Sequence, residues 1–165
     1  YTGVDSQRII TSLTFPDELD RRMQIKRAFI KRDQADNIFA DNEELILGFD
    51  YIVRETIEDV LLAVDVRTSG DVSLYYANDD SLLDSRKRAV GLHRVELKIP
   101  VHLFAPGDYS IAFGFWQPGH ESEHFPVERL TFQRQGEVTR LSSHGIAWPS
   151  LLYIPSDWTY SDNPE

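Results

Sequence analysis

The stretch from His120 to His124 is the best match to catalytic chemistry in this sequence. His120, Glu121 and His124 satisfy His-Glu-x-x-His, in which two imidazoles hold zinc and the glutamate acts on the metal-bound water. That chemistry requires a helix, because both imidazoles must lie on one face. Pro118–Gly119 and Pro126 leave little room for a helix, and no third ligand has a suitable spacing. We therefore predict a loop without a catalytic metal.

No other catalytic constellation stands out. The sequence has no Gly-x-Ser-x-Gly motif, no glycine-rich phosphate loop and no cysteine. The carboxylate pairs Asp79–Asp80 and Glu43–Glu44 lie in a polar segment and at the start of a predicted strand, where solvation explains them better than acid–base catalysis. We predict a protein that is not an enzyme and that needs no cofactor.

A binding surface for sugars has better support. Sugars offer C–H faces to aromatic rings and hydroxyls to carboxylate, amide or guanidinium groups. If side chains alternate regularly between the two faces of each strand, one outer sheet face carries such groups, and Gly48 lies on the same face without a side chain. A single β-bulge would reverse this assignment. The predicted carbohydrate-binding residues are Trp116, Tyr75, Arg67, Asp65 and Asn78.

The strand that must position Trp116 lies within Leu103–Gln117. It follows a turn at residues 105–108, Ala-Pro-Gly-Asp, in which proline and glycine preset the backbone angles. Apolar residues then alternate with small ones, so one face is predicted to join the core and the other to be nearly bare backbone ending at Trp116. Two interpretations of the bare face stay open: a flat ligand platform, or an ordinary strand end. The expected inward residues are Tyr109, Ile111, Phe113 and Phe115; the outward ones are Ser110, Ala112, Gly114 and Trp116.

The rest of the chain repeats this pattern at short intervals. Turn residues separate the segments, as in the loop at residues 68–71, and helical periodicity is almost absent. In the segment 72–77 we expect Val72, Leu74 and Tyr76 to point inward and Ser73 and Tyr75 outward. The sequence predicts an all-β fold, an antiparallel immunoglobulin-like or jelly-roll β-sandwich. The other expected strands are 24–31, 38–39, 44–53, 59–67, 91–99 and 127–133.

The charge balance excludes some classes of partner. With 17 basic and 27 acidic residues, the net charge is −10, which disfavours nucleic-acid binding because phosphates require basic side chains. The one local basic patch, at residues 21–32, is interpreted as the solvated edge of a strand. No apolar run reaches the length of about 20 residues that a membrane span needs.

Three segments resemble the C-terminal domain of the nucleotide-binding subunit of polysaccharide-exporting ABC transporters of the Wzt type. They are ELILGFDYIV, the hairpin segment DVRTSGDVSLYY and IPVHLFAPGDYSIAFGF. The ending GIAWPSLLY is also similar, and the resemblance covers residues 22–153. The residues that match the family's signature are Ile99, Pro100, Leu103, Pro106, Gly107 and Tyr109.

The resemblance implies a non-catalytic carbohydrate-binding domain that recognises a lipid-linked, O-antigen-like polysaccharide for export. It implies a cytoplasmic location at the inner face of the bacterial inner membrane, with the transporter ATPase and membrane subunits as partners. It also implies a homodimer with C-terminal strand exchange within Val127–Trp148. Family binding residues vary with the glycan, so none is carried over.

We expect an N-terminal linker or arm at 1–21, the β-sandwich at 22–153 and a C-terminal tail at 154–165. The alternative function is a structural or oligomerisation β-sandwich with a protein partner, bound through the aromatic tail from Trp148 to Tyr160.

Overall fold

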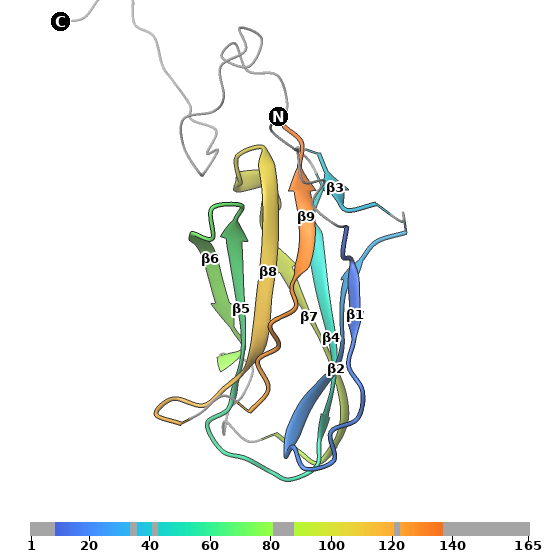
Figure 1. Cartoon of the computed structure of the whole chain (residues 1–165), viewed down its shortest axis with the longest axis vertical. Coiled ribbons are helices and arrows are strands. Elements are labelled where there is room, and N and C mark those ends of the chain that lie inside the picture. Colours follow the sequence, from blue (N-terminus) through green and yellow to red (C-terminus); the bar gives the residue numbers. More distant parts are fainter. Residues whose placement is uncertain (1–8, 34–35, 41–42, 81–87, 121–122, 137–165) are drawn as a thin grey trace, which may run out of the picture.

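Two β-sheets pack face to face in the computed structural model, which describes residues 9–33, 36–40, 43–80, 88–120 and 123–136 (Figure 1). The first sheet has the order β1–β2–β4–β7 and the second β3–β9–β8–β5–β6. All neighbouring strands are antiparallel except β3 and β9, which are parallel. The predicted β-sandwich is confirmed. The strands are β1 (Ser12–Thr14), β2 (Met23–Lys31), β3 (Ile38–Phe39), β4 (Leu45–Val53), β5 (Leu61–Thr68), β6 (Ser73–Asn78), β7 (Gly91–Ile99), β8 (Gly107–Trp116) and β9 (Leu130–Arg134).

The chain connectivity is that of the immunoglobulin-like form of the prediction. Strands β2, β4 and β7 correspond to A, B and E of that fold, and β9, β8, β5 and β6 to G, F, C and C′. Tyr109, near the start of β8, donates a hydrogen bond from its hydroxyl to the carbonyl oxygen of Ala105 at 2.5 Å. Such a tyrosine corner stabilises the turn between strands E and F of these sandwiches. Here a short 3-10 helix, Val101–Leu103, precedes it.

The core lies between β4 and β8, and the side chains of these strands that face it are those that the sequence predicted. Residues 45, 47, 49, 51 and 53 of β4 are buried, as are the inward residues 109, 111, 113 and 115 of β8. The rings of Phe49 and Phe113 meet across the two sheets with centroids 5.2 Å apart. Burial of such a ring stabilises the fold by about 1.5–3 kcal/mol. The core therefore fixes β8 firmly and leaves its other face outward.

Residues 9–20 of the predicted N-terminal arm pack against both sheets. Ser12–Thr14 pair with β2. The amide of Ile10 donates to the hydroxyl of Thr131 on β9 at 2.9 Å, and the amide of Thr131 donates to the carbonyl oxygen of Ile10 at 2.8 Å. Phe15 reaches the core, where its ring meets that of Phe113. This segment therefore links the first sheet to the second along one side of the sandwich.

The C-terminal expectations fall mostly outside the described residues. β9 begins at Leu130, three residues later than the predicted strand, and pairs with β8 of the same chain. The rest of the predicted exchange segment and the tail, residues 137–165, lie outside the described part. In the part of the chain that the structure covers, no helix is long and apolar enough to cross a membrane.

Candidate functional site

The outer face of β8 carries the row of small residues that the sequence predicted. Ser110, Ala112 and Gly114 share this face, and Trp116 ends the row. Because cross-strand partners lie on the same face of a sheet, the neighbouring row on β5 points outward as well. The residues opposite them on β5 are, in the same order, Arg67, Asp65, Ala63 and Leu61.

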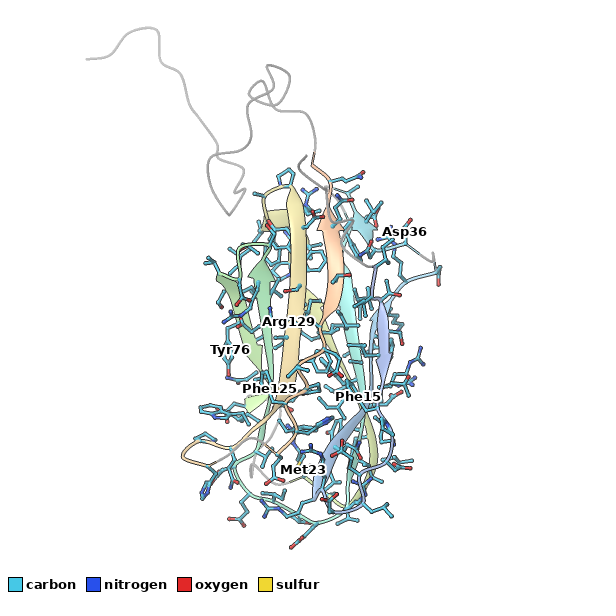
Figure 2. The ribbon with its side chains drawn as sticks, in the orientation of Figure 1. Phe15, Met23, Asp36, Tyr76, Phe125 and Arg129 are labelled. Carbon is cyan, nitrogen blue, oxygen red and sulfur yellow. The ribbon has the colours of Figure 1, made fainter. Side chains whose placement is uncertain are left out.

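A groove of about 300 Å³ opens on this face, in the region where Figure 2 labels Tyr76 and Phe125. Three of its lining side chains are aromatic and partly exposed, Trp116 by 39%, Tyr76 by 53% and Phe125 by 44%. Ala63, also in the lining, has only a methyl side chain and leaves space between the rings. The fifth lining residue, Asp65, supplies a carboxylate. The groove therefore offers apolar ring surfaces around one strong hydrogen-bond acceptor.

The predicted faces of Tyr75 and Tyr76 are wrong. The pairing of β5 with β6 shifts at Leu74, which has no partner in the ladder, and such a bulge reverses the side on which the following residues lie. Tyr75 therefore lies opposite the buried Val66, and its ring centre is 6.2 Å from that of Phe104 in the core. Tyr76 takes the outward position and lines the groove.

A chain of charged side chains borders the groove beside Asp65. Its carboxylate accepts from Arg67 Nε at 2.8 Å and from the Ser73 hydroxyl at 2.5 Å. Arg67 also forms an ion pair with Asp71 at 3.1 Å, and Arg129 forms an ion pair with Asp71 at 2.7 Å. The Arg129 and Arg67 guanidinium groups hold the pKa of the Asp71 carboxyl below its usual range, and the Asp65 and Asp71 carboxylates raise the pKa of Arg67. These groups form an ion-pair network in which positive and negative charges balance.

Residues 117–120 and 123–129, the described part of the loop after β8, do not form the helix that zinc chemistry needs, and Glu121 of the motif lies outside the described residues. The amide of His120 donates to the carbonyl oxygen of Gln117 in a turn, and His124 forms a β-bridge with Phe115. The Nδ1 atom of His124 accepts a hydrogen bond from the amide of Ile25 at 3.1 Å. No group of three or more metal-ligating side chains occurs in the described residues. His124 therefore has a structural role in which its ring joins the two sheets.

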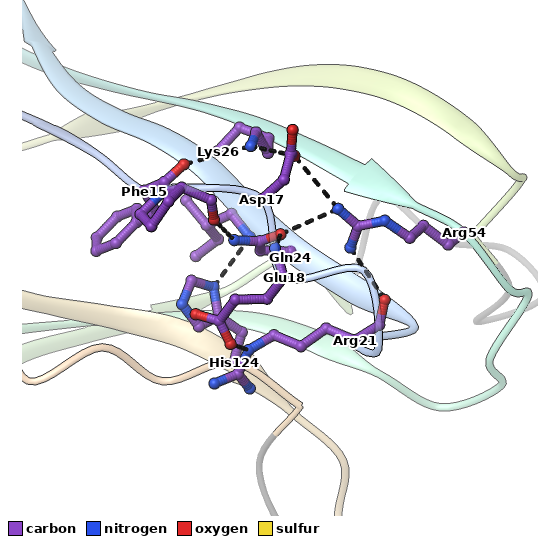
Figure 3. A network of polar contacts seen from close by, with 10 residues as sticks. Phe15, Asp17, Glu18, Arg21, Gln24, Lys26, Arg54 and His124 are labelled. Atoms are coloured by element: carbon purple, nitrogen blue, oxygen red, sulfur yellow. Dashed lines mark hydrogen bonds and ion pairs between the residues drawn. The ribbon is translucent and has the colours of Figure 1, made fainter.

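The surroundings of His124 favour its neutral form (Figure 3). The residue is 5% exposed, and its ring meets that of Phe15 edge-on at 5.3 Å. Burial lowers the pKa of His124, and the positive charge of Arg21 lowers it further. A neutral ring with an unprotonated Nδ1 is also what the hydrogen bond from Ile25 requires.

Polar contacts from the two residues directly before β2 hold the same loop. Arg21 donates from Nη1 to the carbonyl oxygen of Glu123 at 2.6 Å, and Arg22 pairs with the Glu123 carboxylate. Both arginines belong to the predicted basic patch. Figure 3 shows the buried Gln24 beside Arg54, whose guanidinium donates to Gln24 Oε1 at 3.1 Å. The loop that carries Phe125 is therefore bound to the first sheet as well as to β8.

Phe125 lies directly across Gly114. A Cβ atom at position 114 would overlap the Phe125 ring and come within 2.7 Å of the carbonyl oxygen of His124. A glycine in the interior of a strand often marks such a close approach. Gly48 has a similar role on the other sheet, where it lies under Phe29, so it does not belong to the face that carries Trp116.

Comparisons with known proteins agree with this architecture. No protein-family model matches the sequence, and no curated protein matches it. Among solved structures, the crystal structure of the C-terminal domain of Wzt matches with a TM-score of 0.65, covers 93% of both chains and shares 13% of its residues. This chain has the Wzt C-terminal fold. The resemblance in the sequence is confirmed at the level of the fold.

On this Wzt-like fold, the predicted site residues fall into three groups. Trp116 and Asp65 line the groove, and Arg67 is bound to Asp65 at its border. Asn78 lies outward at the edge, outside the groove lining, and accepts a hydrogen bond from the amide of Asp80. Tyr75 faces the core.

Sequence reasoning missed Tyr76 and Phe125. The signal for Phe125 was the bare backbone at Gly114, because an inner strand without side chains requires a cover from elsewhere in the chain. The polar loop that begins directly after Trp116 is the segment nearest to it in sequence. No comparable signal existed for Tyr76, since both tyrosines are adjacent and either could face outward.

Proposed function

We propose that this protein is a non-catalytic carbohydrate-binding domain and that its ligand lies in the groove between Trp116, Tyr76 and Phe125. The observation that carries the proposal is the groove itself, in which three exposed rings surround the carboxylate of Asp65. Aromatic rings stack on the C–H faces of sugars, and a carboxylate accepts hydrogen bonds from their hydroxyls. Partly exposed rings gathered around a groove are typical of ligand sites.

The Wzt C-terminal fold supports a more specific setting. We propose that the polysaccharide is lipid-linked and O-antigen-like, and that the domain recognises it for export by an ABC transporter. In this setting the domain acts at the inner face of the bacterial inner membrane, beside the transporter ATPase and membrane subunits. We further propose that it works as a homodimer with C-terminal strand exchange.

Calorimetric titration of the whole chain with polysaccharides purified from the source organism tests the function. We expect measurable binding by the parent protein, and a loss of about tenfold or more for Trp116→Ala, because a stacked ring contributes roughly 1–2 kcal/mol or more at such a site. Leu92→Ala is the matched control, because Leu92 is 77% exposed on the other sheet and does not line the groove. Absence of binding, or an equal loss in both variants, would contradict the proposal.

A further inference from the structure

The charges around the groove restrict which sugars it can accept. Among the described residues that line the groove, Asp65 is the only one with an acidic or basic side chain. We infer that the groove selects electrically neutral sugar residues and excludes those that carry a carboxylate, phosphate or sulfate group. This inference rests on the proposed carbohydrate-binding function.

The protein contacts of Asp65 orient its carboxylate and leave part of its hydrogen-bond acceptor capacity available. Its two oxygens each accept one bond, from Arg67 Nε at 2.8 Å and from the Ser73 hydroxyl at 2.5 Å. A carboxylate offers about four lone-pair positions, so about two stay available for hydroxyl groups of a sugar. An anionic substituent has no proton to donate there and meets a like charge, which disfavours binding.

The arginines beside the groove give no excess of positive charge to attract an acidic sugar. Arg67 pairs with Asp65 and Asp71, and Arg129 pairs with Asp71. Two positive charges thus balance two negative ones. An acidic sugar that recruited either guanidinium would have to compete with an ion pair that this guanidinium already makes.

The aromatic walls of the groove and the net charge of the protein also disfavour the binding of anionic sugars. The faces of the rings of Trp116, Tyr76 and Phe125 carry negative potential, which attracts polarised C–H groups and repels anions. The net charge of −10 adds a longer-range repulsion of any polyanion at low ionic strength. Neutral pyranose rings avoid each of these penalties.

Carboxyl reduction provides a matched pair of probes that tests the inference. A uronate-bearing bacterial polysaccharide is titrated into the whole chain before and after its carboxyl groups are reduced to alcohols, which keeps the sugar sequence and linkages but removes the charge. A set of neutral polysaccharides is titrated in parallel, and all titrations are run at low and at physiological ionic strength.

We expect the neutral polysaccharides and the reduced form to bind, and the uronate form to bind about tenfold more weakly or not at all. Asp65→Asn keeps the shape of the side chain and removes its charge, so it is expected to narrow this difference, whereas Leu92→Ala is expected to leave it unchanged. A melting curve for each variant confirms that it is folded.

Two results would overturn the inference, and they differ from each other. Binding of the uronate form as tight as that of the reduced form would refute charge selection while leaving carbohydrate binding in place. No binding by any polysaccharide, neutral or acidic, would refute the proposed function and the inference together.

Discussion

The ring of Phe125 lies across the backbone of Gly114, in the space that a side chain on this strand would occupy. This contact converts an otherwise open sheet surface into a groove, because it places an aromatic wall on the bare part of β8. It also depends on His124, whose carbonyl oxygen accepts a hydrogen bond from the amide of Phe115 at 2.8 Å. The groove is therefore assembled from strand residues and from one anchored loop.

Adding a methyl group at position 114 should displace this wall. In Gly114→Ala the new Cβ meets the Phe125 ring and the carbonyl oxygen of His124, so the loop must move. We expect a loss of about 1–3 kcal/mol in the free energy of unfolding, as for other overpacked sites, together with weaker glycan binding. Chemical denaturation and calorimetry measure the two effects.

Gly70→Ala is the control for that substitution, because a Cβ there meets only the Thr68 hydroxyl at 3.8 Å. Equal effects of the two substitutions on binding would contradict the assignment of Phe125 to the groove.

The two adjacent tyrosines should behave differently. Tyr76→Ala removes a groove wall that is half exposed, so we expect weaker glycan binding with a small change in stability. Tyr75→Ala removes a ring that packs on Phe104, so we expect a loss of about 2 kcal/mol in stability, below the roughly 3–5 kcal/mol of a fully buried ring, with binding retained. Denaturation curves and binding isotherms of both variants check this. The reverse pattern would mean that β6 has the regular alternation and no bulge.

Titration of His124 should make both stability and binding depend on pH. Burial lowers the pKa of His124 in the folded state from its usual value of 6.5. The unfolded chain therefore binds a proton more readily, and the free energy of unfolding falls as pH drops below about 6.5, by at most about 1.4 kcal/mol per pH unit. Protonation at Nδ1 also opposes the bond from Ile25, so we expect weaker glycan binding at pH 5.5 than at pH 7.5.

The non-titrating variant His124→Gln identifies the source of that dependence. We expect its stability to be lower at pH 7.5 and its pH dependence between 7.5 and 5.5 to be flatter than that of the parent protein. An unchanged slope in this variant would show that groups other than His124 cause the pH dependence.

A buried ion pair at the end of β6 should matter for stability alone. Asp79 pairs with the buried Arg88, accepts a hydrogen bond from the amide of Leu62 at 2.8 Å, and does not line the groove. Arg88 also donates to the Tyr51 hydroxyl at 2.9 Å. Asp79→Ala leaves a buried guanidinium without its counter-charge, so we expect a loss of roughly 3–5 kcal/mol in denaturation experiments.

Glycan binding by the folded fraction of Asp79→Ala is the companion measurement. We expect it to equal that of the parent protein below the melting temperature. A wild-type stability, or a specific loss of binding in a fully folded sample, would show that this pair has a different role.

Much of the fold could be predicted because burial imposes a period of two on each strand. The inward residues of β4 and β8 alternate without interruption, and the sequence showed them directly. The turn before Tyr109 was also visible, because proline and glycine have fixed backbone preferences. These features depend on residues that are close in the chain.

The rest of the site depends on contacts between distant residues. The bulge at Leu74 is a property of the pairing of β6 with β5, and it exchanged the predicted roles of Tyr75 and Tyr76. The position of Phe125 is set by two hydrogen bonds between residues about 100 positions apart, from the Ile25 amide to His124 and from Arg21 to the carbonyl oxygen of Glu123. No local pattern encodes such contacts, so the groove became visible only in the folded chain.

A glycan in the groove on the outer face of the second sheet would change the surroundings of the residues that line it. Nuclear magnetic resonance titration of the labelled chain with the polysaccharide from the source organism detects this change through amide and indole resonances. We expect the largest shifts in the groove lining, with the indole of Trp116 among them, and unchanged resonances for β1 and β2. Shifts confined to the first sheet, or no shifts at saturating polysaccharide, would contradict glycan binding in this groove. The resonances to follow are those of Ala63, Asp65, Tyr76, Trp116 and Phe125.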